Sequence, residues 1–165
     1  MRQLLAVLLL PFNVTVAIPA LLWWRRGWAM PVARLEAGWV VQLTGSILIA
    51  LGLTWFAGSL RRFASDGQGT LAPWDPPTHL VVTGLYRYVR NPMITGVALV
   101  VLGEAALLVS AAHLEWALAF IAANALMIPL YEEPRLRQRF GAAYDAYCAN
   151  VPRLIPRTTP WHPPS

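Results

Sequence analysis

The stretch that decides the fold is P-M-I-T-G-V-A-L-V-V-L-G-E-A-A-L-L-V-S-A-A, residues 92–112, followed after three residues by W-A-L-A-F-I-A-A-N-A-L-M-I-P-L-Y, residues 116–131. The first run contains one charged residue, Glu104, and the second contains none. A bilayer core about 30 Å thick is spanned by a helix of about 20 apolar residues. Because only His113, Leu114 and Glu115 separate the runs, the sequence predicts a tight antiparallel hairpin of two membrane-spanning helices.

Two further apolar runs lie upstream, over residues 4–24 and 37–60. The first resembles a signal peptide, but it carries two prolines and ends in Trp-Trp-Arg-Arg without a clear small-residue cleavage site, so we expect it to be retained. The sequence thus predicts an all-α polytopic membrane protein with four spans, about 4–24, 37–60, 92–112 and 116–131. Residues 1–157 are expected to form one membrane-embedded domain, and the proline-rich residues 158–165 a disordered tail.

The composition supports this class. Hydrophobic residues make up 57% of the chain and charged residues 13%, whereas soluble domains contain about 25% charged residues. A single cysteine excludes an internal disulfide, and the three scattered histidines predict no metal site. The net charge of +5 could indicate a nucleic-acid partner, but the basic residues lie beside apolar spans. We therefore expect contact with an anionic membrane surface and no nucleic acid.

The arginines predict the orientation. With four spans, both termini and the second loop share one side of the membrane, and this side carries ten of the 13 basic residues. They are Arg2, Arg61, Arg62, Arg87, Arg90, Arg135, Arg137, Arg139, Arg153 and Arg157. The other side carries Arg25, Arg26 and Arg34. Because cytoplasmic loops are enriched in basic residues, we expect both termini in the cytoplasm, in a bacterial inner membrane.

Two cytoplasmic segments hold the polar chemistry. Residues 63–91 are rich in glycine and proline but include aromatic and aliphatic side chains, which favours an ordered binding loop over a solvated spacer. Residues 134–147 predict an amphipathic helix with Leu136, Phe140 and Tyr147 on one face, joined by Ala143 or Tyr144. Such a helix can be a simple membrane-surface anchor.

The pair Glu132-Glu133 is not explained by anchoring, because negative charge at a membrane boundary is costly without a cation beside it. There is no phosphate-binding loop, no lysine and no recognisable nucleophile–histidine set. A carboxylate facing a cation, with aromatic side chains nearby, suits a charged nucleotide-like cofactor such as S-adenosylmethionine.

Four elements occur in a specific order: L-V-V-T-G-L-Y-R-Y-V-R-N-P-M at 80–93, Glu132-Glu133, F-G-x-x-Y-x-x-Y at 140–147 and V-P-R at 151–153. Together they resemble the isoprenylcysteine carboxyl methyltransferase family, within a broader group that includes the phospholipid methyltransferases. The resemblance extends from residue 67 to residue 157. It implies an integral-membrane methyltransferase with a cytoplasmic S-adenosylmethionine site and a lipid substrate that enters from the bilayer. By position, the resemblance implies cofactor contacts at Thr78, His79, Leu80, Val81, Tyr86, Asn91, Pro92, Met93, Ile94 and Glu132, the last holding the methionine end of the cofactor.

Three positions depart from the family pattern. Asn91 and Ile94 stand where the family usually has His and Tyr, and Ile128 stands where members that methylate a prenylcysteine carboxylate have Arg. Ile128, four residues before Glu132, is expected to face the same pocket from the substrate side. Without a guanidinium there, a carboxylate acceptor lacks its charge-matched partner, which leaves an amine, thiol, phenol or other lipid-soluble acceptor open.

The sequence therefore predicts an S-adenosylmethionine-dependent membrane methyltransferase acting on a lipid-soluble or membrane-partitioning acceptor. The alternative is a non-catalytic scaffold or assembly subunit that keeps the fold; a transporter is disfavoured because no inverted repeat is visible. No catalytic residue is assigned, since in-line methyl transfer depends on positioning and exclusion of water. For Glu104, we favour a hydrogen-bonded carboxyl within the helices, with Gln42 or Asn124 as partner, over a general base.

Overall fold

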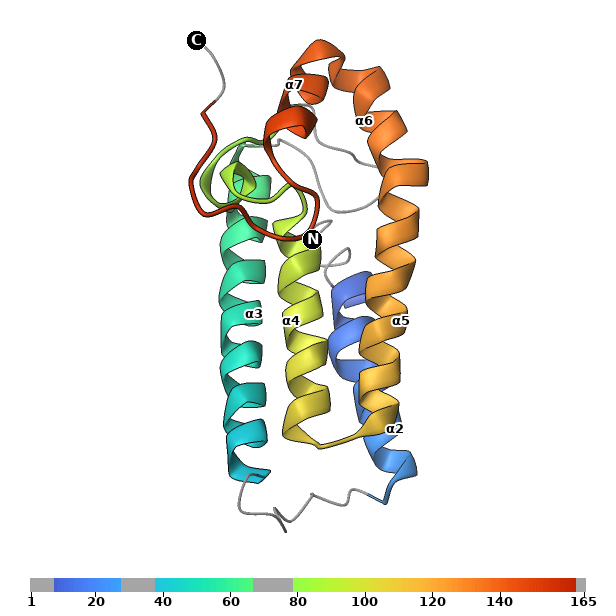
Figure 1. Ribbon diagram of the computed structural model, residues 1–165. Coiled ribbons are helices and arrows are strands. Elements are labelled where there is room, and N and C mark those ends of the chain that lie inside the picture. Colours follow the sequence, from blue (N-terminus) through green and yellow to red (C-terminus); the bar gives the residue numbers. More distant parts are fainter. Residues whose placement is uncertain (1–7, 28–37, 67–78, 163–165) are drawn as a thin grey trace. The chain divides into compact units, whose positions relative to one another are not determined.

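The computed structural model describes residues 8–27, 38–66 and 79–162, and over these residues the chain forms helices and irregular segments without a β-strand (Figure 1). The elements in chain order are η1 (Leu8–Ala17, π-helical), α2 (Ile18–Arg25), α3 (Gly38–Asp66), η2 (Gly84–Arg87, a 3₁₀ turn), α4 (Pro92–Leu107), α5 (Ala111–Met127), η3 (Ile128–Glu132, π-helical), α6 (Glu133–Phe140) and α7 (Ala142–Asn150). The prediction of an all-α fold is confirmed for this part of the chain.

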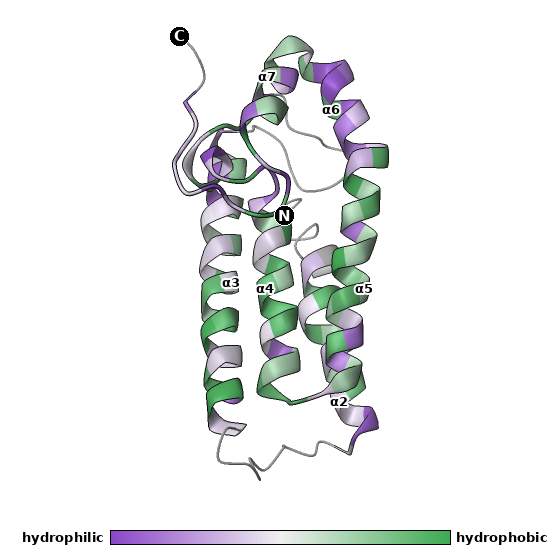
Figure 2. Ribbon diagram, in the orientation of Figure 1, coloured by the Kyte–Doolittle hydropathy of each residue, from purple (hydrophilic) through white to green (hydrophobic). Residues whose placement is uncertain are grey.

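Two helical runs are long and apolar enough to cross a membrane. They are α3, with 29 residues, and the 30-residue run from Ala111 to Phe140 that joins α5, η3 and α6. At about 1.5 Å per residue each is about 45 Å long, more than a bilayer core requires. Helix α4 is apolar but shorter, with 16 residues. Figure 2 shows α4 and α5 as largely hydrophobic, with hydrophilic residues gathered on α6. Two of the four predicted spans thus meet the length criterion, and the arrangement of four spans stays a prediction.

The chain divides into two compact units: residues 1–54 with 96–121, and residues 55–95 with 122–165. In the first unit, helices α3 and α4 run antiparallel and touch along their glycines. A Cβ atom placed on Gly45 would lie 2.5 Å from the Leu107 backbone nitrogen, and one on Gly52 would lie 2.5 Å from the Gly96 carbonyl oxygen. From the other side, a Cβ on Gly103 would meet the Gly45 carbonyl oxygen at 2.7 Å. Such backbone contact is the usual basis of helix association in lipid, where water does not drive apolar surfaces together.

The turn between α4 and α5 lies earlier than the sequence predicted. Helix α4 ends at Leu107 and α5 begins at Ala111, so the predicted turn at residues 113–115 is wrong. Ser110 explains the shift, because its hydroxyl accepts a hydrogen bond from the His113 backbone N–H at 3.5 Å and lies 2.8 Å from Nδ1 of the same residue. A serine three residues before the bonded N–H is an N-cap. Val109 closes the turn with φ +43°, a conformation that β-branched residues rarely adopt.

The first helical segment is attached to α5 inside the same unit. The indole N–H of Trp116 donates to the Val14 carbonyl at 3.0 Å, and His113 Nε2 lies 3.2 Å from the Pro19 carbonyl oxygen. The Val14 carbonyl is available because Pro19, one π-turn later, has no N–H to donate to it. This segment therefore packs against α5 within the first unit, and its retention stays a prediction.

The core of the second unit forms around the end of the chain. Tyr144, Tyr147 and Val151 are almost fully buried. The side chains packed against them are Leu80, Val82, Leu136, Phe140, Cys148 and Trp161. The predicted apolar face of the amphipathic helix is confirmed in this cluster, although the helix breaks in two at Gly141, whose φ of +53° ends α6.

The expected disordered tail is not found over the described residues of that segment. Trp161 packs 5.8 Å from the Tyr147 ring, measured between centroids. Its backbone N–H donates to the Arg87 carbonyl at 2.9 Å, and the Arg157 N–H donates to the Tyr88 carbonyl at 3.0 Å. High proline content does not exclude an extended chain that such bonds hold in place.

Candidate functional site

The two adjacent carboxylates of the acid pair have different surroundings. Glu133 is buried, and its carboxylate binds two guanidinium groups. Arg153 donates from Nε at 2.6 Å and from its terminal nitrogen at 3.1 Å, and Arg90 donates from Nη1 at 2.9 Å. The hydrogen bond to Glu133 raises the pKa of Arg153 above its usual value. Glu133 is thus a structural anchor whose charge is fully compensated.

Glu132 is exposed and makes no hydrogen bond or ion pair with any residue that the structure describes. It is the last residue of η3, where the hydrogen-bonding pattern changes from α to π before α6 begins. Short π-helical segments inside α-helices occur frequently at functional sites. Of the two acids, Glu132 is therefore the one that has no cation beside it among the described residues.

The π segment also changes the relation between Ile128 and the acid pair. The Glu133 backbone N–H donates to the Ile128 carbonyl, so Ile128 lies one π-turn before Glu133. The Ile128 side chain is buried, with 2% of its surface exposed, whereas Glu132 is exposed. A common pocket for these two side chains stays a prediction.

Tyr86 is the most informative residue of the loop. It lies in η2 and is buried, and its carbonyl oxygen accepts a hydrogen bond of 2.6 Å from the Tyr147 hydroxyl. Its own hydroxyl is buried and has no hydrogen-bond partner within the described part of the chain. Burial raises the pKa of Tyr86, with smaller contributions from Tyr147 and from the nearby Glu132. The Tyr86 hydroxyl is therefore a buried polar group that no described residue satisfies.

The remaining predicted loop residues serve packing or lie at the surface. Val81 is buried, and Leu80 packs against the tyrosine cluster. His79 is exposed. Thr78, the first predicted contact, lies outside the described residues.

The predicted residues 91–94 form the start of α4. The Asn91 carbonyl accepts the first helical bond, from the Thr95 N–H at 3.0 Å, and the buried Pro92 occupies the first helical position, as proline often does. The Asn91 side-chain amide donates to the Arg153 carbonyl at 3.1 Å. Met93 and Ile94 are half-buried. Asn91 is therefore held by residue 153, which also holds Glu133.

Sequence reasoning missed three residues that build this site: Arg90, Arg153 and Trp161. Arg90 contacts both Glu133 and the Cys148 sulfur, the latter at 2.7 Å. The motif V-P-R contained Arg153, but its partner could not be read from sequence because the two lie 20 positions apart. An aromatic residue inside a proline-rich tail was the available signal for Trp161.

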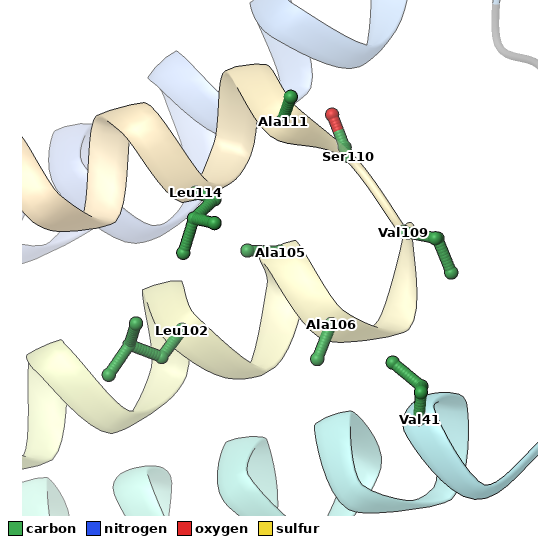
Figure 3. Close-up of a pocket in the computed structure, with 8 residues that line it drawn as sticks. All are labelled: Val41, Leu102, Ala105, Ala106, Val109, Ser110, Ala111 and Leu114. Atoms are coloured by element: carbon green, nitrogen blue, oxygen red, sulfur yellow. The ribbon is translucent and has the colours of Figure 1, made fainter. Parts of the chain in front are cut away.

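An apolar cavity of about 370 Å³ lies in the first unit and contains none of the predicted site residues (Figure 3). It is lined by Val41, Leu102, Ala105, Ala106, Val109, Ser110, Ala111 and Leu114. The nearby acid Glu104 has a buried Oε2 atom without a hydrogen-bond partner in the described part of the chain, and Gln42 donates to the Leu107 carbonyl at 3.4 Å. Among the described residues, no three His, Cys, Asp or Glu side chains gather as a metal site would require.

Residues 40–143 match the family model of the phospholipid methyltransferases. The chain belongs to this family. No curated protein and no solved structure matches it.

The match to the phospholipid methyltransferase family contains all but the first two residues of α3, together with the loop that carries Tyr86, helix α4 and the acid pair. Residues 151–161, which contact both the loop and Glu133, lie beyond the matched region. The resemblance inferred from sequence is thus confirmed at the level of the family. Together with the two long apolar helices, it identifies a membrane protein of a methyltransferase family.

Proposed function

We propose that this protein is an integral-membrane methyltransferase that uses S-adenosylmethionine and acts on a lipid-soluble or membrane-partitioning acceptor. The family match supports methyl transfer in general. The observation that carries the cofactor assignment is the division within the acid pair: Glu133 is neutralised by two arginines, while Glu132 is exposed with no cation on it among the described residues.

The residues present fit this cofactor. S-adenosylmethionine carries an ammonium and a sulfonium, and a carboxylate without a counter-ion is the natural partner of the ammonium. The buried Tyr86 hydroxyl, which lacks a partner in the described part of the chain, can donate to a carboxylate or ribose oxygen. Leaving such a hydroxyl unsatisfied costs about 1–3 kcal/mol, which a polar ligand recovers.

When bound, S-adenosylmethionine supplies a methyl group on a positively charged sulfur, ready for in-line displacement by a nucleophile. The protein residues then have three tasks. Glu132 holds the amino-acid end in place, and Tyr86 with the start of α4 fixes the orientation of the rest. The apolar surroundings exclude water, which would compete with the acceptor. Correct placement of two reactants can supply about 7–11 kcal/mol of the barrier reduction, so a general base is not required.

The acceptor is proposed to be neutral or deprotonatable and not a prenylcysteine carboxylate. Ile128 is buried and apolar at the position where carboxylate-methylating relatives have arginine. A carboxylate brought against such a side chain loses water without gaining a partner, at a cost of several kcal/mol. We expect no turnover of a farnesylcysteine analogue. Robust turnover of that compound would assign the guanidinium role to another residue and overturn the acceptor proposal alone.

The decisive experiment incubates purified protein with methyl-labelled S-adenosylmethionine and a native lipid extract. Transfer of label to an extractable lipid supports the proposal, and Glu132→Gln serves as the impaired control. A non-catalytic scaffold, the alternative function, should bind no S-adenosylmethionine in detergent and transfer no label. Binding with label release only to water would indicate that the acceptor is absent from the extract and is not a membrane lipid.

A further inference from the structure

Residues 152–161, here named the clasp, run beside the loop that carries Tyr86 and Asn91 (Figure 1, red segment beside the green one). Backbone hydrogen bonds join the two at several points. The N–H groups of Arg90 and Asn91 donate to the carbonyls of residues 152 and 153 at 2.8 and 3.2 Å, and the clasp N–H groups of residues 157 and 161 donate back at 3.0 and 2.9 Å. These backbone bonds all join the clasp to residues 87–91, and the Thr95 hydroxyl of α4 adds another bond by donating to the Leu154 carbonyl at 3.0 Å.

Arg153 connects both halves of the proposed cofactor site. Its guanidinium binds Glu133 through two hydrogen bonds, next to Glu132 in the chain. Its carbonyl oxygen accepts two bonds from Asn91, one from the backbone N–H at 3.2 Å and one from the side-chain amide at 3.1 Å. One residue therefore fixes the end of η3 against the start of α4.

The far end of the clasp is fixed by Trp161. Arg87 and Trp161 exchange two hydrogen bonds, since the Trp161 N–H donates to the Arg87 carbonyl at 2.9 Å and Arg87 Nε donates to the Trp161 carbonyl at 3.0 Å. The indole packs against Tyr147, whose hydroxyl holds the Tyr86 carbonyl at 2.6 Å. Tyr86, the residue before Arg87, is thus held by the Tyr147 hydroxyl and, through its neighbour, by the two bonds between Arg87 and Trp161.

We propose that the clasp is a positioning element for cofactor binding and that Arg153 is its central positioning residue, acting on Glu132 through Glu133 and on the loop through Asn91. This inference rests on the proposed function, because the ligand whose affinity it controls is S-adenosylmethionine. Arg153 makes no contact with the cofactor in this proposal. Its effect is geometric: it keeps the Glu132 carboxylate and the Tyr86 hydroxyl at the spacing that one ligand requires.

The test measures S-adenosylmethionine affinity by calorimetry on the full-length protein in detergent. Arg153→Gln should weaken binding about tenfold, the equivalent of about 1.4 kcal/mol. Arg90 still neutralises Glu133 in this variant, so the protein should fold. Arg153→Lys keeps the charge but not the two-pronged geometry, and it should recover part of the lost affinity. Arg137→Gln, the same change at an exposed arginine outside the clasp that pairs with Asp145 at 3.0 Å, is the matched control and should bind like wild type.

A double-variant measurement separates positioning from simple stability. If Arg153 acts through Glu132, then Arg153→Gln should change the affinity of the Glu132→Gln protein by less than threefold, because the contact to be positioned is already gone. Full additivity, or wild-type affinity in Arg153→Gln, overturns the inference and leaves the proposed function standing. A wild-type protein that binds no S-adenosylmethionine overturns both.

Discussion

Exchanging each acid of the pair for its uncharged amide should separate ligand binding from folding. Glu132→Gln removes a charge that no described residue compensates, so its free energy of unfolding should stay within about 0.5 kcal/mol of wild type. Its affinity for S-adenosylmethionine should fall by about 1.5–3 kcal/mol, the value of one hydrogen bond to a charged group. This corresponds to a dissociation constant about 10- to 150-fold higher.

Glu133→Gln should mainly affect folding, with a loss of S-adenosylmethionine affinity no larger than that of Arg153→Gln, because it weakens the same positioning contact. The substitution weakens three hydrogen bonds of 2.6, 2.9 and 3.1 Å and leaves two guanidinium groups without a counter-ion. Breaking a buried ion pair from one side costs about 3–5 kcal/mol. The Arg153 side chain is 37% exposed, so water relieves part of this cost and we expect the lower end, about 3 kcal/mol.

Two assays on the same detergent preparations decide the matter. Thermal unfolding, followed by near-ultraviolet circular dichroism, reports stability, and calorimetric titration below the unfolding temperature reports affinity. We expect the unfolding temperature to fall below that of wild type only in Glu133→Gln. The reasoning is refuted if Glu132→Gln unfolds early while keeping full affinity, because Glu132 would then be the structural acid.

Three further outcomes are expected. Gly45→Ala should destabilise the protein by about 1–3 kcal/mol, since the new Cβ meets backbone at 2.5 Å. Gly58→Ala, where a Cβ has nothing within 4 Å, should stabilise α3 by about 0.5–1 kcal/mol. Equal unfolding temperatures of the two variants would contradict the glycine contact. Tyr147→Phe should cost about 1–3 kcal/mol in the same unfolding assay because a buried carbonyl loses its donor at 2.6 Å, while the exposed Tyr131→Phe should be neutral. A reporter that works only in the cytoplasm should be active when fused after Ser165. Activity of a reporter that works only outside the cytoplasm would show that the predicted topology is wrong.

Sequence pattern predicted the elements whose cause is local. The described residues 38–60 of the second apolar run, and the run at residues 116–131, fall within long helices. Apolar composition over that length has few other stable outcomes in lipid. The helical spacing of Leu136, Phe140 and Tyr147 likewise predicted a shared buried face. The hairpin turn was missed because hydropathy alone was used to place it, although Ser110 offered a capping signal.

The assignments that pattern could not provide depend on contacts between distant segments. Two adjacent glutamates are equivalent in sequence, and only the positions of Arg90 and Arg153 distinguish the compensated acid from the available one. The π-turn that changes the register of Ile128 has no single-residue signal. Proline content suggested disorder for a segment that backbone hydrogen bonds hold in place, and those bonds are made to residues about 70 positions earlier.

That separation along the chain has a consequence for biosynthesis. Asn91 leaves the ribosome 62 residues ahead of Arg153, the residue that accepts its hydrogen bonds. At about 5–20 residues per second, the interval is about 3–12 s. During this interval α3 and α4 are already synthesised, while residues 87–91 lack the clasp residues that hold them. On the proposed function, a translation product cut short before Pro152 would contain both helices but would lack the clasp that positions the cofactor site.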